Sequence, residues 1–172
     1  MFSFYKTHYN PLYNKLVELS RNIFFYEKLT LKDNFETRIN LIFVHFSLIL
    51  IVFKKKEIEF PQEIFDNIFM NIEYHIRELG YGDVAVNKKM KTLTRILYDI
   101  LLKINKKDQN KFLINKSVLK TYFHTETEDN KQIIDDIELY FINFFHYCFE
   151  LGNVNMLKGR INFKYKVANG SS

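Results

Sequence analysis

The feature that most constrains the fold is the apolar run INLIFVHFSLILIVF, from Ile39 to Phe53. It contains three polar residues, Asn40, His45 and Ser47. The run is shorter than the roughly 20 apolar residues that a helix needs to cross a bilayer. Because it is apolar nearly all round, it predicts a buried central helix over residues 34–53. Lysines at 54–56 suit the end of that helix, where the helix dipole attracts cations.

Apolar residues recur at intervals of three and four along much of the remaining chain, which is the pattern of amphipathic helices. Further helices are predicted over residues 11–27, 61–79, 84–104, 109–123 and 129–151. Residues 160–167, RINFKYKV, are compatible with a short strand or an extended strap. The sequence therefore predicts an all-α fold, a single domain of five to seven packed helices over residues 1–168, with a frayed tail at 169–172.

Composition sets broad limits on function. The chain has 172 residues, of which 25 are basic and 20 acidic, so its formal net charge is +5. That small excess permits contact with RNA, anionic lipid or an acidic protein and requires none of them. We expect no contact with DNA. A single cysteine, Cys148, rules out an internal disulfide.

Residues typical of catalytic or metal sites do not occur at the required spacing. The five histidines form no HExxH pair, and His146 and Cys148 lie on different sides of a predicted helix. His45 is interpreted as a hydrogen-bonded core residue, because it lies in the most apolar helix. Cys148 lies between Tyr147 and Phe149 and is not expected to act as a nucleophile. No catalytic residue, metal or cofactor is predicted.

The segment RELGYGDVAVNKKMK, residues 77–91, resembles a phosphate loop at first sight. It lacks the Gly-Lys-Ser/Thr that such a loop needs, and no strand precedes it. We predict instead that Gly80 ends one helix in a left-handed conformation, Gly82 allows a tight corner, and Asp83 caps the next helix. Lys88, Lys91 and Arg95 follow on one side of that helix. Their basic face is either simply solvated or docks a partner.

Several spaced motifs of the chain resemble the ubiquinol–cytochrome c chaperone family. They are SRNIFFY at 20–26, F-x-x-R with a later histidine between Phe35 and His45, Q-x-x-F-D-x-x-F at 62–69 and R-E-x-G-x-G-D-x-x-V-x-K-x-M-K at 77–91. The resemblance covers about Leu12 to Tyr98. Its most characteristic positions are Arg77, Glu78, Gly80, Gly82, Asp83, Val86, Lys88, Met90 and Lys91. Tyr81 replaces a small aliphatic residue, and Asp99-Ile100 replace the expected Gly-Arg.

The resemblance implies a non-enzymatic chaperone that binds a hydrophobic client, apo-cytochrome b or another subunit, during assembly of the cytochrome bc1 complex. A small partner protein, the ribosome or an anionic membrane surface are further expected partners. The hypothetical partner-binding residues are Arg77, Glu78, Asp83, Lys88, Lys91 and Arg95, around a structural corner at Gly80 and Gly82. Two alternatives stay open: an RNA- or ribosome-associated helical protein, and an enzyme acting on a lipid or quinone.

The N-terminal residues lack the apolar segment and cleavage site of a secretory signal. We therefore expect a bacterial member of the family to act in the cytoplasm, peripherally at the inner membrane. A eukaryotic member would act in the mitochondrial matrix or at the inner membrane.

Overall fold

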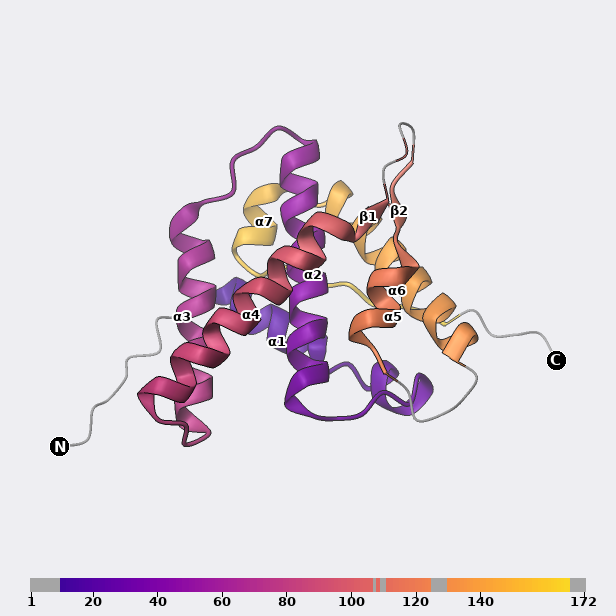
Figure 1. Cartoon of the computed structure of the whole chain (residues 1–172). Coiled ribbons are helices and arrows are strands. Elements are labelled where there is room, and N and C mark those ends of the chain that lie inside the picture. Colours follow the sequence, from indigo (N-terminus) through magenta and orange to yellow (C-terminus); the bar gives the residue numbers. More distant parts are fainter. Residues whose placement is uncertain (1–9, 107, 109–110, 125–129, 168–172) are drawn as a thin grey trace.

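Helix α2, Phe35–Lys55, forms the centre of the bundle in the computed structural model (Figure 1). Every side chain from Ile39 to Ile49 is buried, which confirms the predicted central helix. The helix begins where the Asn34 side chain accepts a hydrogen bond of 2.9 Å from the backbone N–H of Thr37. Helix α2 is long and apolar enough to cross a membrane, but 72% of the apolar 18-residue stretch that gives this result is buried inside the fold.

The structure describes residues 10–106, 108, 111–124 and 130–167. In chain order its elements are α1 Pro11–Ser20, the π-helix η1 Phe24–Lys28, α2, α3 Gln62–Glu78, α4 Asp83–Lys103, β1 Asn105–Lys106, β2 Leu113–Ile114, α5 Lys116–Tyr122, α6 Asn130–Glu150 and α7 Asn153–Leu157. The two short strands pair antiparallel, with Asn105 opposite Ile114. The fold is a single helical domain, as predicted.

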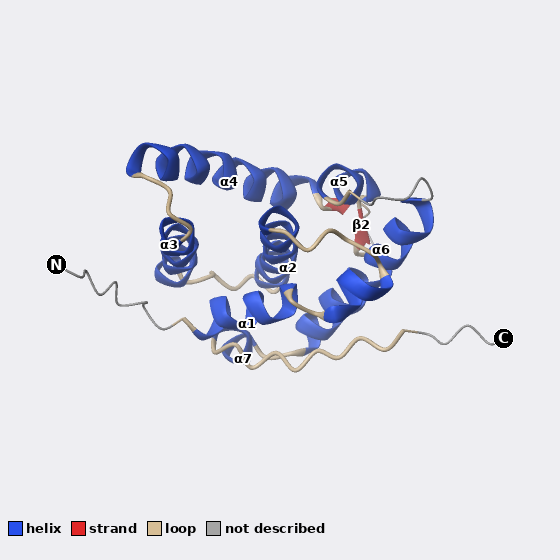
Figure 2. Cartoon of the chain, turned by 90° about the horizontal axis from the view of Figure 1, so that it is seen from below, coloured by secondary structure: helices blue, strands red, loops and turns tan. Residues whose placement is uncertain are grey.

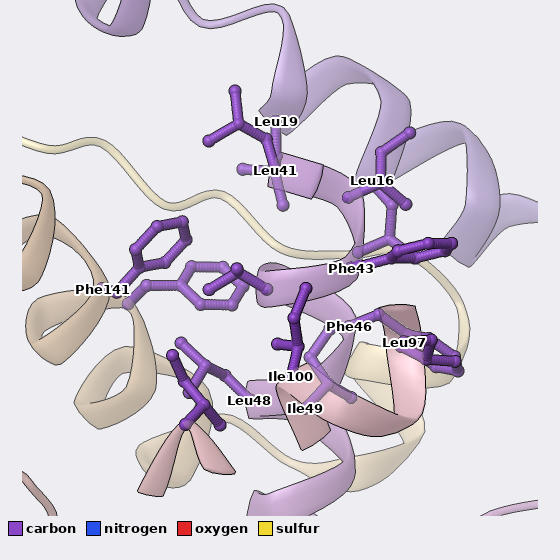
Figure 3. Close-up of a cluster of buried hydrophobic side chains, with 14 of the residues drawn as sticks. Leu16, Leu19, Leu41, Phe43, Phe46, Leu48, Ile49, Leu97, Ile100 and Phe141 are labelled. Carbon is purple, nitrogen blue, oxygen red and sulfur yellow. The ribbon is translucent and has the colours of Figure 1, made fainter. Parts of the chain in front are cut away.

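The other helices pack around α2 on several sides. Its direct neighbours include α1, α4 and α6. Figure 2 shows α4 as an outer layer across α3 and α2, with α1 and α7 on the opposite side. Helix α3 reaches α2 through aromatic rings, such as Phe46 and Phe65 with centroids 5.7 Å apart. Leu16, Phe43, Leu97, Ile100 and Phe141 come from four helices and gather in one core (Figure 3).

Two predicted helices were wrong in extent. The helix expected over 11–27 ends at Ser20, because the Asn22 side chain accepts a hydrogen bond from the Phe24 N–H and starts η1 instead. A helix was expected over 109–123, but the described residues of this range form the strand β2 followed by α5. There the Asn115 side chain accepts a hydrogen bond from the Ser117 N–H, so the helix starts only at Lys116.

The C-terminal segment runs as an extended strap rather than a strand. Residues 160–167 have no regular secondary structure. Ile161 is buried, and the rings of Phe163 and Tyr165 lie 5.4 and 5.3 Å from that of Tyr140. The strap therefore covers aromatic residues of α6. The tail predicted at 169–172 lies outside the described residues.

Candidate functional site: the α3–α4 corner

The corner between α3 and α4 is stabilised differently from what the sequence predicted. Gly80 has φ of +94° and ends α3 in the left-handed region, as predicted. Gly82 is the N-cap of α4 at φ of −74°, a conformation that needs no glycine. Asp83 does not cap α4, which was the predicted role. It is the first helical residue, and its carboxylate accepts a hydrogen bond from the Arg77 guanidinium instead.

Arg77 thereby ties the two helices together. Its second contact is to Glu73 at 3.0 Å, one turn earlier on α3. The Arg77–Asp83 pair closes the corner, while Glu78 is exposed beside it. Lys89 places its ammonium group 4.3 Å from the centroid of the Tyr81 ring, a cation–π distance. These contacts explain why charged residues cluster here without invoking a ligand.

The remaining predicted site residues lie farther along α4. Lys88, Lys91 and Arg95 are all exposed on one face of the helix. Among the described residues none of the three has an ion-pair partner. The structure thus separates the six predicted residues into the Arg77–Asp83 pair that holds the corner, the exposed Glu78 beside it, and a basic face of three cations. Glu78 and the basic face are exposed to a partner, whereas the pair already binds within the corner.

Two apolar depressions near this face were missed at the sequence level. A groove of about 370 Å³ between α2 and α4 has Phe35, Ile39, Leu93 and Ile96 in its lining. A cleft of about 590 Å³ between α1, α2 and α3 shares Phe35 and Ile39, so the two hollows lie on either side of the first turns of α2. Of these residues, Ile39 was predicted only as part of the buried apolar run of α2. A groove between helices depends on how separate helices pack together, and the periodicity of a single helix does not predict this packing.

The buried histidine does no site chemistry. His45 Nδ1 lies 2.6 Å from the carbonyl oxygen of Leu41, so this nitrogen must carry the proton and donate it. The Tyr140 hydroxyl then donates to Nε2 at 2.9 Å. Burial lowers the pKa of His45 to about 4, only partly offset by the bond to Leu41. The prediction of a hydrogen-bonded core histidine is confirmed.

Neither the cysteine nor a metal cluster adds chemistry in the described part of the chain. Cys148 is buried, and burial raises the pKa of its thiol, which suppresses the reactive thiolate. The described residues include no group of three or more His, Cys, Asp or Glu side chains that could hold a metal ion.

A family model described as ubiquinol–cytochrome c chaperone matches residues 27–132, more than half of the chain. The chain belongs to this family. The match spans α2 to α5 and includes the corner and the basic face of α4. Family membership supports a chaperone role in cytochrome bc1 assembly and suggests binding rather than catalysis.

The fold of this family member is shared with a solved structure. It is similar to the crystal structure of the Cbp3 homolog from Brucella abortus, with a TM-score of 0.64, 20% identity and coverage of 90% of this chain and 87% of that one. No curated protein sequence matches the chain significantly. The helical bundle that carries the corner is thus a known architecture.

Proposed function

We propose that this chaperone binds apo-cytochrome b before the subunit joins the cytochrome bc1 complex. The observation that carries the proposal is the family match across α2 to α5. An assembly chaperone of this complex acts in the cytoplasm or in association with the membrane. We place this chain at the membrane surface, because its hydrophobic client must be kept from aggregating until it is inserted or assembled.

The surface around the first turns of α2 suits such a client. The α1–α2–α3 cleft and the α2–α4 groove present apolar side chains on either side of Phe35 and Ile39. Leu79 and Val84 at the corner are exposed as well. An apolar segment of a client would bury these side chains, and each buried methylene group contributes about 0.8 kcal/mol. The cations of α4 border this surface and would select acidic neighbours.

The double substitution Lys88→Glu with Lys91→Glu is expected to weaken capture of newly made cytochrome b at least about tenfold, because it replaces two cations of the basic face with carboxylates. Both side chains are exposed, so the helical fold should persist. Co-purification of cytochrome b with the tagged chain measures the effect, and circular dichroism checks the fold.

A matched control is Lys164→Glu with Lys166→Glu on the strap. It changes the net charge equally and also alters two exposed lysines. It should leave capture unchanged. If the α4 variant also captures cytochrome b at the wild-type level, the basic face has no part in client binding and the corner is only structural.

A further inference from the structure

The outer face of α4 carries a second regular stripe besides its core stripe. Its members are spaced four, three, four, three and four residues apart, and they form what we call the α4 seam: Val84, Lys88, Lys91, Arg95, Tyr98 and Leu102. Residues at these intervals lie along one face of a helix. All six side chains are exposed. The buried stripe from Val86 to Ile104 repeats the same intervals on the opposite face.

The apolar members of the α4 seam stand at its two ends. Val84 is 83% exposed at the first turn, and Leu102 is 78% exposed at the last, with Tyr98 one turn before it at 46%. Single exposed apolar residues are ordinary on protein surfaces. Here the three fall at helical intervals on one face of α4, the outer layer of the bundle (Figure 2), with Tyr98 and Leu102 on adjacent turns.

The middle of the seam is positively charged and unpaired. Lys88, Lys91 and Arg95 follow one another without a carboxylate between them on this face. Asp99, one turn after Arg95, already contacts the Lys103 ammonium group and accepts a hydrogen bond from the Tyr122 hydroxyl. Glu36 shares the lining of the α2–α4 groove with Lys88 but forms no ion pair with the three cations in the described part of the chain. The three cations are therefore exposed without a carboxylate partner.

We propose that the α4 seam docks a helix of a partner protein, with acidic side chains opposite the three cations and apolar side chains at both ends. Alternating steps of four and three are the intervals at which two helices pack side by side. Opposite charges in the centre would fix register and select the partner. The seam spans roughly 27 Å at about 1.5 Å per residue, so it matches a partner helix of about five turns.

Grooves on both sides of α4 complete this surface. The α2–α4 groove of about 370 Å³ lies on one side. On the other, a depression of about 330 Å³ between α3 and α4 includes Phe69 and Met90 in its lining. Both hollows open beside α4, where it meets α2 and α3. The aliphatic stems of the lysines would cover apolar surface while their ammonium groups meet carboxylates.

The order of residues along the seam favours a helix over a membrane or RNA. A helix lying in a membrane surface presents a continuous apolar stripe with cations at its edges. Here the cations occupy the middle of the stripe and separate its apolar ends. A phosphate backbone would meet the cations but leave Val84 and Leu102 without an apolar partner.

This inference rests on the proposed docking role of the corner but can be tested without cytochrome b. Two synthetic helical peptides of about 21 residues serve as probes. Both carry leucines at the end positions that face the seam. One carries three glutamates at the central facing positions, and the other carries three lysines. Fluorescence anisotropy of the labelled peptides with the full chain at low salt measures binding.

We expect the glutamate peptide to bind the wild-type chain at least about tenfold more tightly than the lysine peptide. The triple variant Lys88→Glu, Lys91→Glu, Arg95→Glu should reverse that preference. The control Lys158→Glu, Lys164→Glu, Lys166→Glu makes the same change in net charge at exposed positions elsewhere and should keep the wild-type preference. Circular dichroism verifies that both variants are folded.

The proposal is overturned if the two peptides bind the wild-type chain equally, or if the control variant loses the preference as fully as the seam variant. It is also overturned if no peptide binds while vesicles with about 30% anionic lipid or a single-stranded RNA bind through the same three cations. If the wild-type chain captures cytochrome b but binds neither peptide, the seam proposal fails and the proposed function stands. If it binds the peptides with the expected preference but does not capture cytochrome b, the proposed function fails and the seam proposal stands.

Discussion

Replacing Gly159 with alanine is expected to destabilise the folded chain by about 2–4 kcal/mol. Gly159 has φ of +67°, and a Cβ atom placed there would lie 2.3 Å from the carbonyl oxygen of Pro11 and 2.7 Å from its carbonyl carbon. These are backbone atoms in the first turn of α1, so no side-chain rotation can relieve the overlap. The midpoint of urea unfolding measures the loss.

Gly152→Ala is the matched control for this effect. The nearest atom to its added Cβ is the Asn155 side-chain nitrogen at 3.9 Å, an ordinary contact. Its cost should stay below about 1 kcal/mol, the usual cost of removing a weak N-cap. Equal destabilisation by the two alanines would show that the contact between Gly159 and α1 does not hold the start of the strap in place.

Acidification from pH 7 to pH 5 is expected to lower the free energy of unfolding by about 2 kcal/mol. Burial lowers the pKa of His45 to about 4 in the folded chain, against 6.5 for an unperturbed histidine. As the pH falls, His45 therefore binds a proton in the unfolded chain at a higher pH than in the folded chain. The stability that neutral His45 contributes is complete above pH 6.5 and is lost progressively toward pH 4.

Carboxylates contribute to acid sensitivity in a lower window. Asp99 has a lowered pKa because the Lys103 ammonium group and the Tyr122 hydroxyl bond to its carboxylate, so its contribution is lost only as the pH falls below the ordinary value of 3.8. Urea unfolding of the wild type and of His45→Gln at pH 7, 6 and 5 isolates the contribution of His45, because this range lies above the carboxylate window. The free energy of unfolding of the variant should change less between pH 7 and pH 5 than that of the wild type. Identical pH profiles would contradict the assignment.

Strong helical periodicity was enough to predict most of the bundle. The buried run in α2, the stripe of α4 and the left-handed Gly80 all follow from local patterns, and the structure agrees with them. The break at Asn22 was missed because a single side-chain hydrogen bond ends α1 against a continuing apolar pattern. The β1–β2 pair was missed because pairing depends on a partner segment, not on the segment itself.

The candidate site was only partly visible in the sequence. The basic face of α4 was predicted from spacing, and its exposure agrees. The ion pair between Arg77 and Asp83 was not predicted. Two residues six positions apart across a turn have no fixed relative geometry until the corner forms. Tyr98 and Leu102 were not recognised as part of the same face, because apolar residues in a helix are first expected in the core.

The level of assembled cytochrome bc1 complex in a strain that lacks this chain shows whether the chain is an assembly chaperone. We expect the assembled complex and haem-loaded cytochrome b both to fall well below the wild-type level, and a plasmid copy of the wild-type chain to restore them. Native gels and difference spectra of the membranes provide the two measurements. Normal amounts of complex and of haem-loaded cytochrome b in the deletion strain would rule out the proposed chaperone role.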